Sequence, residues 1–449
     1  MKKLFLSLLT FCCTVPLQAQ NYKKLYDRYL NAQVLVNDFS GAVLISKNGK
    51  IIYQNAFGLA NREWNISNTI ETRFPIGSLT KQFTAAAILQ LQEQGKLNTG
   101  DKLSKYFPDY PKGDLVTLHM LLNHTSGIKE CSENPHWLTI NPNLPIAQLQ
   151  DTIMKTFKFE PYDFEPGTFW KYSNSGYILL GYIIEQTSGE TFADYIQKHV
   201  LQPAGMNRSG TLSQDAIVTE LADGYSKNNG QWKKADFQPT NIGFSAGILY
   251  ATVGDLFKWQ QALFRGKIIS EKSLKLMNTP NHAEKGAGYG VFIDRNFNHK
   301  VIQHQGALSG FNTYMAEYPD DGICVIVLTN RDTNLDFVPK GLAAIVLGKE
   351  VIPTYKRQRK TITAATAQKY AGNYTGDGLP FPVYISEKNG KLYLQLYREV
   401  ELVPESETKL YIDEPDVEIQ IEYIRNTLNE IKQVYFIEAG VKTEITKVL

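Results

Sequence analysis

The chain of 449 residues is 43% hydrophobic and 20% charged, with 47 Lys and Arg residues against 45 Asp and Glu. This composition is typical of a globular protein with room for one large domain and one smaller domain. Because a nearly neutral chain has no broad attraction to phosphate backbones, we expect no nucleic acid partner.

The N-terminal segment, residues 1–19, has the pattern of a signal peptide. Two lysines precede an apolar run over 4–15, and Ala19 supplies a small residue at the end, which is the order of an export signal. The run is too short to span a bilayer, and no later run approaches ~18 apolar residues, so we expect no integral membrane segment after cleavage. We therefore predict a periplasmic or secreted protein. A lipid anchor through Cys12 or Cys13, or a buried N-terminal helix, is a less favoured alternative.

Cleavage would leave two cysteines, Cys131 and Cys324. Cys324 lies in an apolar run that is typical of a buried strand, where cysteine behaves as a small hydrophobic residue. Pairing of the two in an oxidising compartment stays open as the less favoured alternative. The seven histidines lack Cys-x-x-Cys or His-Glu-x-x-His spacing, so we predict no metal site and no cofactor.

The first 350 residues predict one α/β domain whose terminal strands share a sheet. Two β-branched runs, 41–46 and 51–57, flank an Asn-Gly pair, which is a strong signal for a hairpin. A helix-forming stretch runs from Leu79 to about Gln94, and the region 97–290 is mostly helical with long loops. Strand patterns return over 301–305, 311–318 and 323–329.

The pattern changes after residue 350. A basic stretch over 351–368 predicts a linker, and 369–449 contains short alternating runs separated by turns. This spacing predicts a small all-β domain that forms a closed meander or barrel. We expect the signal peptide to end at 19, and the main domain to occupy 20–350. We expect the β domain to cap the main domain, with substrate binding by its loops as the alternative.

The sharpest candidate for chemistry is Ser78-Leu79-Thr80-Lys81, at a predicted strand-to-helix junction. A helix N-terminus favours developing negative charge on the serine oxygen, and a lysine one turn along the helix lies within reach of it. The apolar helix behind Lys81 would desolvate the ammonium group and lower its pKa towards that of a useful base. The same spacing occurs at 126–129 and 406–409 without this setting, and Ser78 could instead only cap the helix.

Tyr172 and Asn174 lie in a predicted loop ahead of an apolar helix. Close to a cationic lysine, the phenol pKa should fall, and Tyr172 could then relay a proton between nucleophile and leaving group. Asn174 could donate to a substrate carbonyl or hold Lys81. It could also be the N-cap of the helix, and these roles are compatible.

The third candidate is His304-Gln305-Gly306-Ala307 at a predicted strand end. Gly306 would let substrate lie against the backbone. The N–H groups of Ala307 and Ser78 could form an oxyanion hole. A lone histidine at a strand end is more often structural, so His304 gains weight only from the other two motifs.

With Ser78, Tyr172 and His304 in this order and these settings, the chain resembles the serine β-lactamase and penicillin-binding protein superfamily. It is most similar to the branch of class C β-lactamases, D-alanyl carboxypeptidases and family-VIII-type esterases. The likeness runs from about residue 35 to 335 and includes Leu121-Leu122-Asn123-His124-Thr125-Ser126-Gly127. It implies an antiparallel sheet flanked by helices, with a helical subdomain. The C-terminal part resembles the lipocalin-like appendage of many such hydrolases.

The resemblance also implies a role for each motif residue. Ser78 would be the acylated nucleophile, and Lys81 and Tyr172 the proton-handling pair. The expected substrate-binding residues are Asn174, His304, Gly306 and Ala307, and His124 is expected to be a structural loop residue.

One departure concerns the third motif, where β-lactamases and D,D-peptidases of this branch usually have Lys-Thr-Gly and this chain has His304-Gln305-Gly306. Histidine is mostly neutral at pH 7, and the threonine hydroxyl is absent. Recognition of a substrate carboxylate therefore loses support, and hydrolysis of an ester or an unusual peptide fits better.

We therefore predict an exported serine hydrolase that forms an acyl-enzyme on Ser78 and cleaves a small-molecule or peptide substrate at an ester or amide bond. One alternative is a class C-like β-lactamase or D-alanyl-D-alanine carboxypeptidase. Another is a catalytically silent, penicillin-binding-like sensor.

Overall fold

The computed structural model describes residues 14–213, 216–228, 230–236, 240–281, 285–332, 337–377, 379, 381–396, 398–414 and 417–448. The described residues fall into two compact units. The sheet-and-helix unit comprises residues 40–44 and 54–333, and the barrel unit comprises residues of 1–39, 45–53 and 334–449.

A six-stranded sheet has the order β10-β11-β12-β13-β1-β2. The four strands β10 (Phe292–Asn296), β11 (His299–Leu308), β12 (Phe311–Tyr318) and β13 (Ile323–Thr329) pair antiparallel along the chain. Strands β1 (Gly41–Lys47) and β2 (Lys50–Phe57) join the sheet next to β13, so the terminal strands of the domain share a sheet, as predicted.

The predicted hairpin between β1 and β2 is confirmed. Asn48 and Gly49 have φ values of 51° and 71°, the left-handed conformations that a two-residue hairpin turn requires. The two strands therefore enter the sheet as one local unit.

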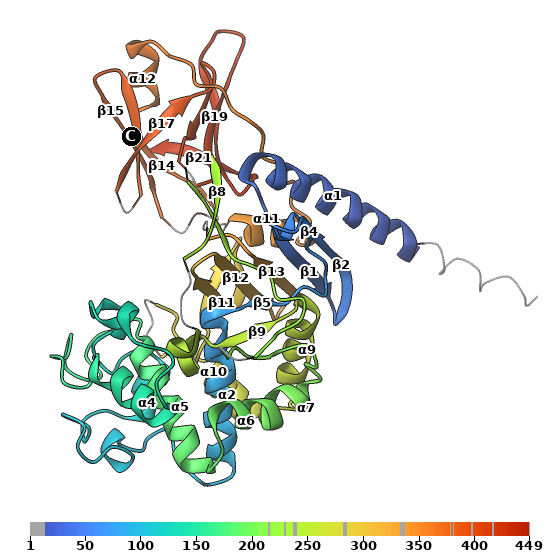
Figure 1. Cartoon of the computed structure of the whole chain (residues 1–449). Helices are drawn as coiled ribbons and strands as arrows, with labels where there is room; N and C mark the ends of the chain where they lie inside the picture. The colour runs from blue at the N-terminus through green and yellow to red at the C-terminus, as the bar shows by residue number, and fades with distance from the viewer. Residues whose placement is uncertain are drawn as a thin grey trace, which may run out of the picture. The chain divides into compact units, whose positions relative to one another are not determined.

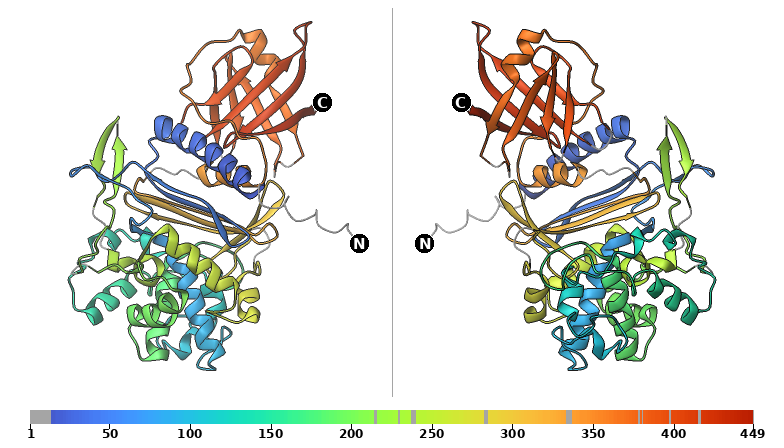
Figure 2. Two further views of the ribbon diagram at one scale, coloured as in Figure 1. Left: turned by 90° about the vertical axis from the view of Figure 1, so that its right-hand side faces the viewer. Right: turned by 90° about the vertical axis from the view of Figure 1, so that its left-hand side faces the viewer.

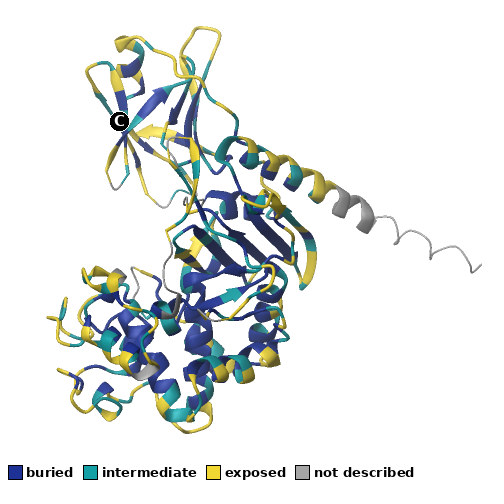
Figure 3. Ribbon diagram, viewed as in Figure 1, coloured by how far each residue is buried: buried dark blue, intermediate teal, exposed yellow. Residues whose placement is uncertain are grey.

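The helices of the sheet-and-helix unit lie together against one face of its strands (Figures 1 and 2). Its central helices are α2 (Thr80–Glu93) and α5 (Asn174–Ser188). Both are buried along most of their length, and the buried residues are dark blue in Figure 3. The predicted end of α2 is confirmed, because Gly95 follows the helix in a left-handed conformation with φ of 71°.

The remaining helices of this unit are shorter. They are α3 (Leu118–Leu122), α4 (Ile146–Lys155), α6 (Phe192–Ile196), α7 (Gln202–Ala204), α8 (Phe244–Gly247), α9 (Val253–Phe264) and α10 (Glu271–Met277). The small strands are β3 (Leu59–Asn61), β4 (Ile66–Ser67), β5 (Phe74–Pro75), β6 (Gly210–Thr211), β7 (Tyr225–Asn228), β8 (Gln231–Lys234) and β9 (Leu249–Ala251).

The predicted C-terminal β domain is a closed antiparallel barrel in which each strand pairs with the next and the last pairs with the first. Its strands are β14 (Gly372–Thr375), β15 (Val383–Lys388), β16 (Lys391–Gln395), β17 (Glu399–Pro404), β18 (Lys409–Ile412), β19 (Ile419–Arg425), β20 (Ile431–Glu438) and β21 (Val441–Val448). Side chains fill its interior, and the rings of Tyr370 and Tyr423 stack there at 3.6 Å between centroids.

Three helices belong to the barrel unit: α1 (Thr14–Asn37), α11 (Phe337–Val346) and α12 (Ala364–Tyr370).

Residues 1–13 of the predicted signal peptide lie outside the described residues. Across the described ranges, no helix is both long enough and apolar enough to cross a membrane. Cys131 and Cys324 are both buried and unpaired.

Candidate active site

Ser78 lies in a single helical turn, η1 (Gly77–Leu79), directly ahead of α2. Its side chain makes no capping hydrogen bond to the helix, so the alternative role as a helix cap is wrong. Instead, Ser78 Oγ accepts a hydrogen bond from Lys81 Nζ at 3.0 Å. The predicted pairing of serine and lysine one turn apart is therefore present, and Ser78 is partly exposed.

Lys81 is fully buried, and its ammonium group has three acceptors. Besides Ser78, Nζ donates to Asn174 Oδ1 at 2.7 Å and to the Ala246 carbonyl oxygen at 2.9 Å. Burial lowers the pKa of Lys81 to about 7, and the carboxylate of Glu130 opposes this shift. Because both protonation states are accessible near neutral pH, this amine can take and return a proton.

Asn174 is the first residue of α5, and Ser173 rather than Asn174 caps the helix. The Ser173 hydroxyl accepts from Gly176 N at 3.3 Å, which leaves the Asn174 side chain free to bind Lys81. The N-cap role considered for Asn174 is therefore wrong, and the role as a lysine anchor is present.

Glu130 is a member of the site that the sequence analysis missed. Its buried carboxylate accepts from the backbone nitrogen of Asn174 at 2.5 Å and from Asn174 Nδ2 at 2.8 Å. The Ser132 hydroxyl also donates to it at 2.7 Å. Its only signal in the sequence was an acidic residue shortly after the segment 121–127, and nothing there indicates a partner at position 174.

Tyr172 places its hydroxyl in the same buried region. The hydroxyl makes no hydrogen bond to any described residue, and the Lys81 Nζ lies 4.9 Å from the ring centroid. Burial raises the pKa of Tyr172 above its ordinary value; a weak interaction with the Ser78 hydroxyl opposes this shift without reaching hydrogen-bond geometry. The expected fall in the phenol pKa is therefore wrong, because burial, with the charge of Glu130, outweighs the interaction that lowers the pKa. Tyr172 therefore stays protonated at neutral pH.

Strand β11 brings the third motif against the serine turn. The Thr313 hydroxyl donates to the Ile76 carbonyl at 2.9 Å, and a Cβ on Gly306 would lie 2.0 Å from the same oxygen. A Cβ on Gly77 would lie 3.0 Å from the Ala307 nitrogen. The two glycines therefore allow the backbone of Ala307 to lie beside the turn that carries Ser78.

His304 is buried between the rings of Phe292 and Tyr172, at centroid distances of 5.2 and 6.3 Å. Its Nδ1 hydrogen-bonds the carbonyl oxygen of Gln305, so Nδ1 carries the proton and Nε2 is an acceptor. Nε2 is buried without a partner among the described residues. Burial and the charge of Lys81 lower the pKa of His304 to about 3, so the imidazole is neutral at pH 7.

His124 supports the loop that carries Tyr172. Its Nδ1 accepts from Ser173 N at 3.1 Å, and its ring packs 4.5 Å from that of Tyr172.

Within the described ranges, no cluster of three or more His, Cys, Asp or Glu side chains could hold a metal ion.

The fold and the Ser78–Lys81 pair define a protein of the β-lactamase type. Residues 35–350 match the Beta-lactamase family, and the chain belongs to that family. Penicillin-binding protein 4* of Bacillus subtilis (strain 168) is 28% identical over 417 residues, which are 86% of this chain and 90% of that protein. D-aminopeptidase of Brucella anthropi is 26% identical over 323 residues, 69% of this chain and 59% of that enzyme.

Among solved structures, the octameric penicillin-binding protein homologue from Pyrococcus abyssi aligns with a TM-score of 0.65 and 27% identity. The alignment covers 94% of this chain and 99% of that chain. A match of this extent includes the C-terminal barrel as well as the sheet-and-helix unit.

Proposed function

We propose that the protein is a serine hydrolase that cleaves an ester or amide bond through an acyl-enzyme on Ser78. The observation that carries the proposal is the 3.0 Å hydrogen bond from Lys81 to Ser78. The donor is a buried lysine whose pKa is about 7, so the neutral amine is available to activate the hydroxyl.

In the acylation step, neutral Lys81 takes the proton of Ser78 while Oγ attacks the substrate carbonyl carbon. The N–H groups of Ser78 and Ala307 stabilise the oxyanion. Tyr172 gives its proton to the leaving group as the scissile bond breaks, and the Lys81 ammonium restores that proton. Water then attacks the acyl carbon, Lys81 takes one water proton, and Ser78 Oγ leaves and takes that proton from Lys81, which restores the neutral amine.

The substrate preference follows from His304. A neutral imidazole with a buried acceptor atom offers no charge to a carboxylate. It favours a substrate group that donates a hydrogen bond, such as an amide N–H, a hydroxyl or an amine. The D-aminopeptidase relative supports an amide or peptide bond beside a free amine as one form of this substrate class.

A second candidate function is acylation by β-lactams, because penicillin-binding proteins are among the relatives. Turnover of a chromogenic cephalosporin, or a stable penicilloyl adduct on Ser78, would support it. A catalytically silent sensor would instead bind its ligand equally well after Ser78→Ala. The order of charge, apolar run and small residue over 1–19 supports export to the periplasm or the medium.

The test is hydrolysis of p-nitrophenyl butyrate by the mature protein, Ser78→Ala and Ser406→Ala. Ser406 has the same Ser-x-x-Lys spacing but lies in a barrel turn, where its hydroxyl accepts from Lys409 N at 3.0 Å. We expect a loss of roughly 10³-fold or more in Ser78→Ala alone. Equal rates in all three proteins would show that Ser78 is not the nucleophile.

A further inference from the structure

The barrel unit contains a polar pocket of about 330 Å³. It lies between the end of α1, the segment 354–357 and the residues that follow β18. All residues that line it belong to the barrel unit, so it is separate from the site at Ser78.

Arg357 lines this pocket with hydrogen-bond donors that have no acceptor. Its side chain is only 11% exposed. The guanidinium lies 5.4 Å from the ring centroid of Tyr355 and 5.5 Å from that of Tyr411. Ring faces stabilise the charge but do not satisfy the in-plane N–H groups, and Nε and Nη2 make no hydrogen bond to a described residue.

Glu418 lines the same pocket with an acceptor that has no donor. Its side chain is 3% exposed, and Oε2 accepts from Gln33 Nε2 at 3.1 Å. Oε1 makes no hydrogen bond to a described residue, and Arg357 Nη2 lies 3.9 Å from it. Burial raises the pKa of Glu418, and the hydrogen bond from Gln33, the charge of Arg357 and an interaction with Thr354 oppose the shift.

Buried polar atoms nearly always have partners, and leaving a charged one without a partner is costly. Here, Arg357 and Glu418 form an ion pair at 3.9 Å, a separation too long for a hydrogen bond, so the hydrogen bonds of both groups stay unmade. A bound molecule that has a hydrogen-bond acceptor next to a donor would supply the missing hydrogen bonds of both Arg357 and Glu418. One water molecule occupies about 30 Å³ in the liquid. The pocket is therefore much larger than a single water and has the size of a small-molecule site.

We propose that this pocket binds a free amino acid as its zwitterion, with the carboxylate on Arg357 and the ammonium group on Glu418. A planar guanidinium suits a carboxylate, and the two groups of an α-amino acid are close enough to reach both residues. Asp413 and Glu414 also line the pocket, but they pair with Arg359 and Arg398, which leaves Arg357 and Glu418 as the charged pair that a ligand would meet. The tyrosine rings flank the side chain of the ligand. The proposal does not depend on hydrolysis at Ser78.

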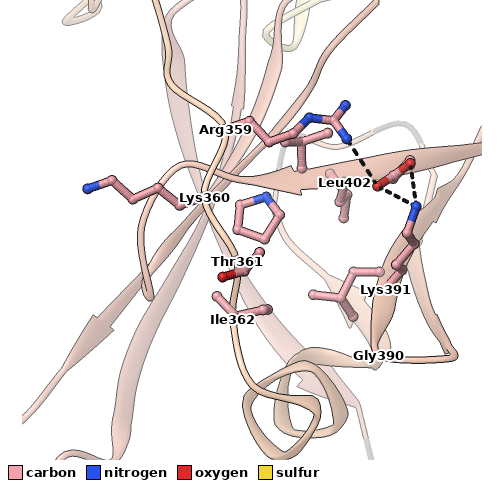
Figure 4. A pocket seen from close by; sticks show the side chains of 11 residues that line it. Arg359, Lys360, Thr361, Ile362, Gly390, Lys391 and Leu402 are labelled. Carbon is pink, nitrogen blue, oxygen red and sulfur yellow. Dashed lines mark hydrogen bonds and ion pairs between the residues drawn. The ribbon is translucent and has the colours of Figure 1, made fainter.

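The larger pocket of the barrel wall, about 650 Å³, lacks this arrangement (Figure 4). There, Arg359 and Lys391 both pair with Glu401, at 3.8 and 3.3 Å. Their side chains are 58% and 56% exposed, so solvent and a shared partner already satisfy them. Of these two pockets, the one at Arg357 combines buried charge with unmade hydrogen bonds.

The experiment is isothermal titration calorimetry on full-length Ser78→Ala protein, a background that prevents turnover. The probes are D- and L-alanine, D- and L-phenylalanine, N-acetylalanine and alaninamide. We expect at least one free amino acid to bind, and the N-acetylated and amidated forms to bind about tenfold more weakly or worse, because each lacks one charged end. Binding of N-acetylalanine and alaninamide as tight as that of free alanine would overturn the proposal.

The variants Arg357→Met and Glu418→Gln are each expected to lose about tenfold or more in affinity for the amino acid. Arg295→Met, the same change at an exposed arginine of β10, should leave it unchanged. Circular dichroism checks folding; if Arg357→Met does not fold, Glu418→Gln carries the test because it keeps the size of the side chain. No binding by any free amino acid would mean that the pocket holds only water. Binding that survives in Glu418→Gln would place the ligand elsewhere, and either result contradicts the proposal.

Discussion

Glu130 receives two hydrogen bonds from Asn174, one from its backbone nitrogen and one from its side-chain Nδ2. The second bond fixes which end of the amide faces Lys81, because a carboxylate accepts only from the NH₂ end. Asn174 Oδ1 is thereby left to accept from Lys81. Glu130 therefore positions Lys81 through Asn174, and its charge opposes the effect of burial on the lysine pKa.

Glu130→Gln should move the pH profile of the reaction. The Glu130 carboxylate raises the pKa of Lys81 against the effect of burial, so its neutralisation lowers that pKa. Neutral Lys81 then persists to lower pH, and the acidic limb of kcat/KM shifts to lower pH. The rate at pH 7 should fall about tenfold, since one of two anchoring hydrogen bonds is lost.

The matched control for this change is Glu133→Gln. Glu133 lies three residues further on, is exposed, and pairs with Lys129 and Lys171. Its neutralisation should leave both the limb and the rate unchanged. If the acidic limb of kcat/KM in Glu130→Gln lies at the same pH as in the parent, Glu130 supports the fold without affecting the charge state of Lys81.

The parent enzyme should have an acidic limb in kcat/KM with a midpoint of about 7, the pKa of Lys81. Activity rises with pH through this value because the neutral amine is the base. Lys81→Arg should lose roughly 10³-fold or more, since a guanidinium does not give up its proton in this range. Rates measured from pH 5 to 9 test this. A profile that stays flat through pH 7 would contradict the assignment of Lys81 as the base.

Tyr172→Phe should harm amide hydrolysis more than hydrolysis of a p-nitrophenyl ester. An amine must be protonated to leave, and loss of a general acid costs about 10²–10⁴-fold, whereas p-nitrophenolate leaves without a proton. Tyr177→Phe is the control. The ring centroid of this buried tyrosine lies 5.5 Å from Lys81 Nζ, but its hydroxyl donates to the Leu122 carbonyl oxygen and not towards the site. Equal losses on both substrates in Tyr172→Phe would exclude the proton-donor role.

Gly306→Ala should lower both stability and activity. The new methyl group would meet the Ile76 carbonyl and the Thr313 hydroxyl, which would push β11 away from the serine turn. Such overpacking costs about 1–3 kcal/mol, and a misplaced site loses roughly 10²-fold in rate. A Cβ on Gly254 in α9 would make only an ordinary contact with the Thr252 hydroxyl, at 3.8 Å, so Gly254→Ala should leave activity unchanged and should not lower stability. Thermal unfolding and ester hydrolysis measure the pair, and a fully active Gly306→Ala would contradict the close approach.

Local patterns carried most of what the sequence predicts correctly. The Asn48-Gly49 turn, the end of α2 and the pairing of Ser78 with Lys81 all depend on neighbours within a few residues. The alternating runs after 369 likewise predict the barrel, because strand periodicity is local.

The features that the sequence analysis missed depend on distant contacts. Glu130 binds Asn174 across 44 positions, through a loop whose path no short pattern specifies. The raised pKa of Tyr172 comes from burial by many side chains. Ser173 and Asn174 are both good capping residues, and only the tertiary contact with Lys81 decides which of them caps α5.

The most direct test of the account is to trap the acyl-enzyme. The parent protein, Ser78→Ala and Ser406→Ala would be mixed with p-nitrophenyl butyrate, quenched in acid within the first turnovers, and measured by intact mass and peptide mapping. We predict one added butyryl group on Ser78 in the parent and in Ser406→Ala, and none in Ser78→Ala. A butyryl group on another residue, or ester turnover that persists in Ser78→Ala, would contradict the account.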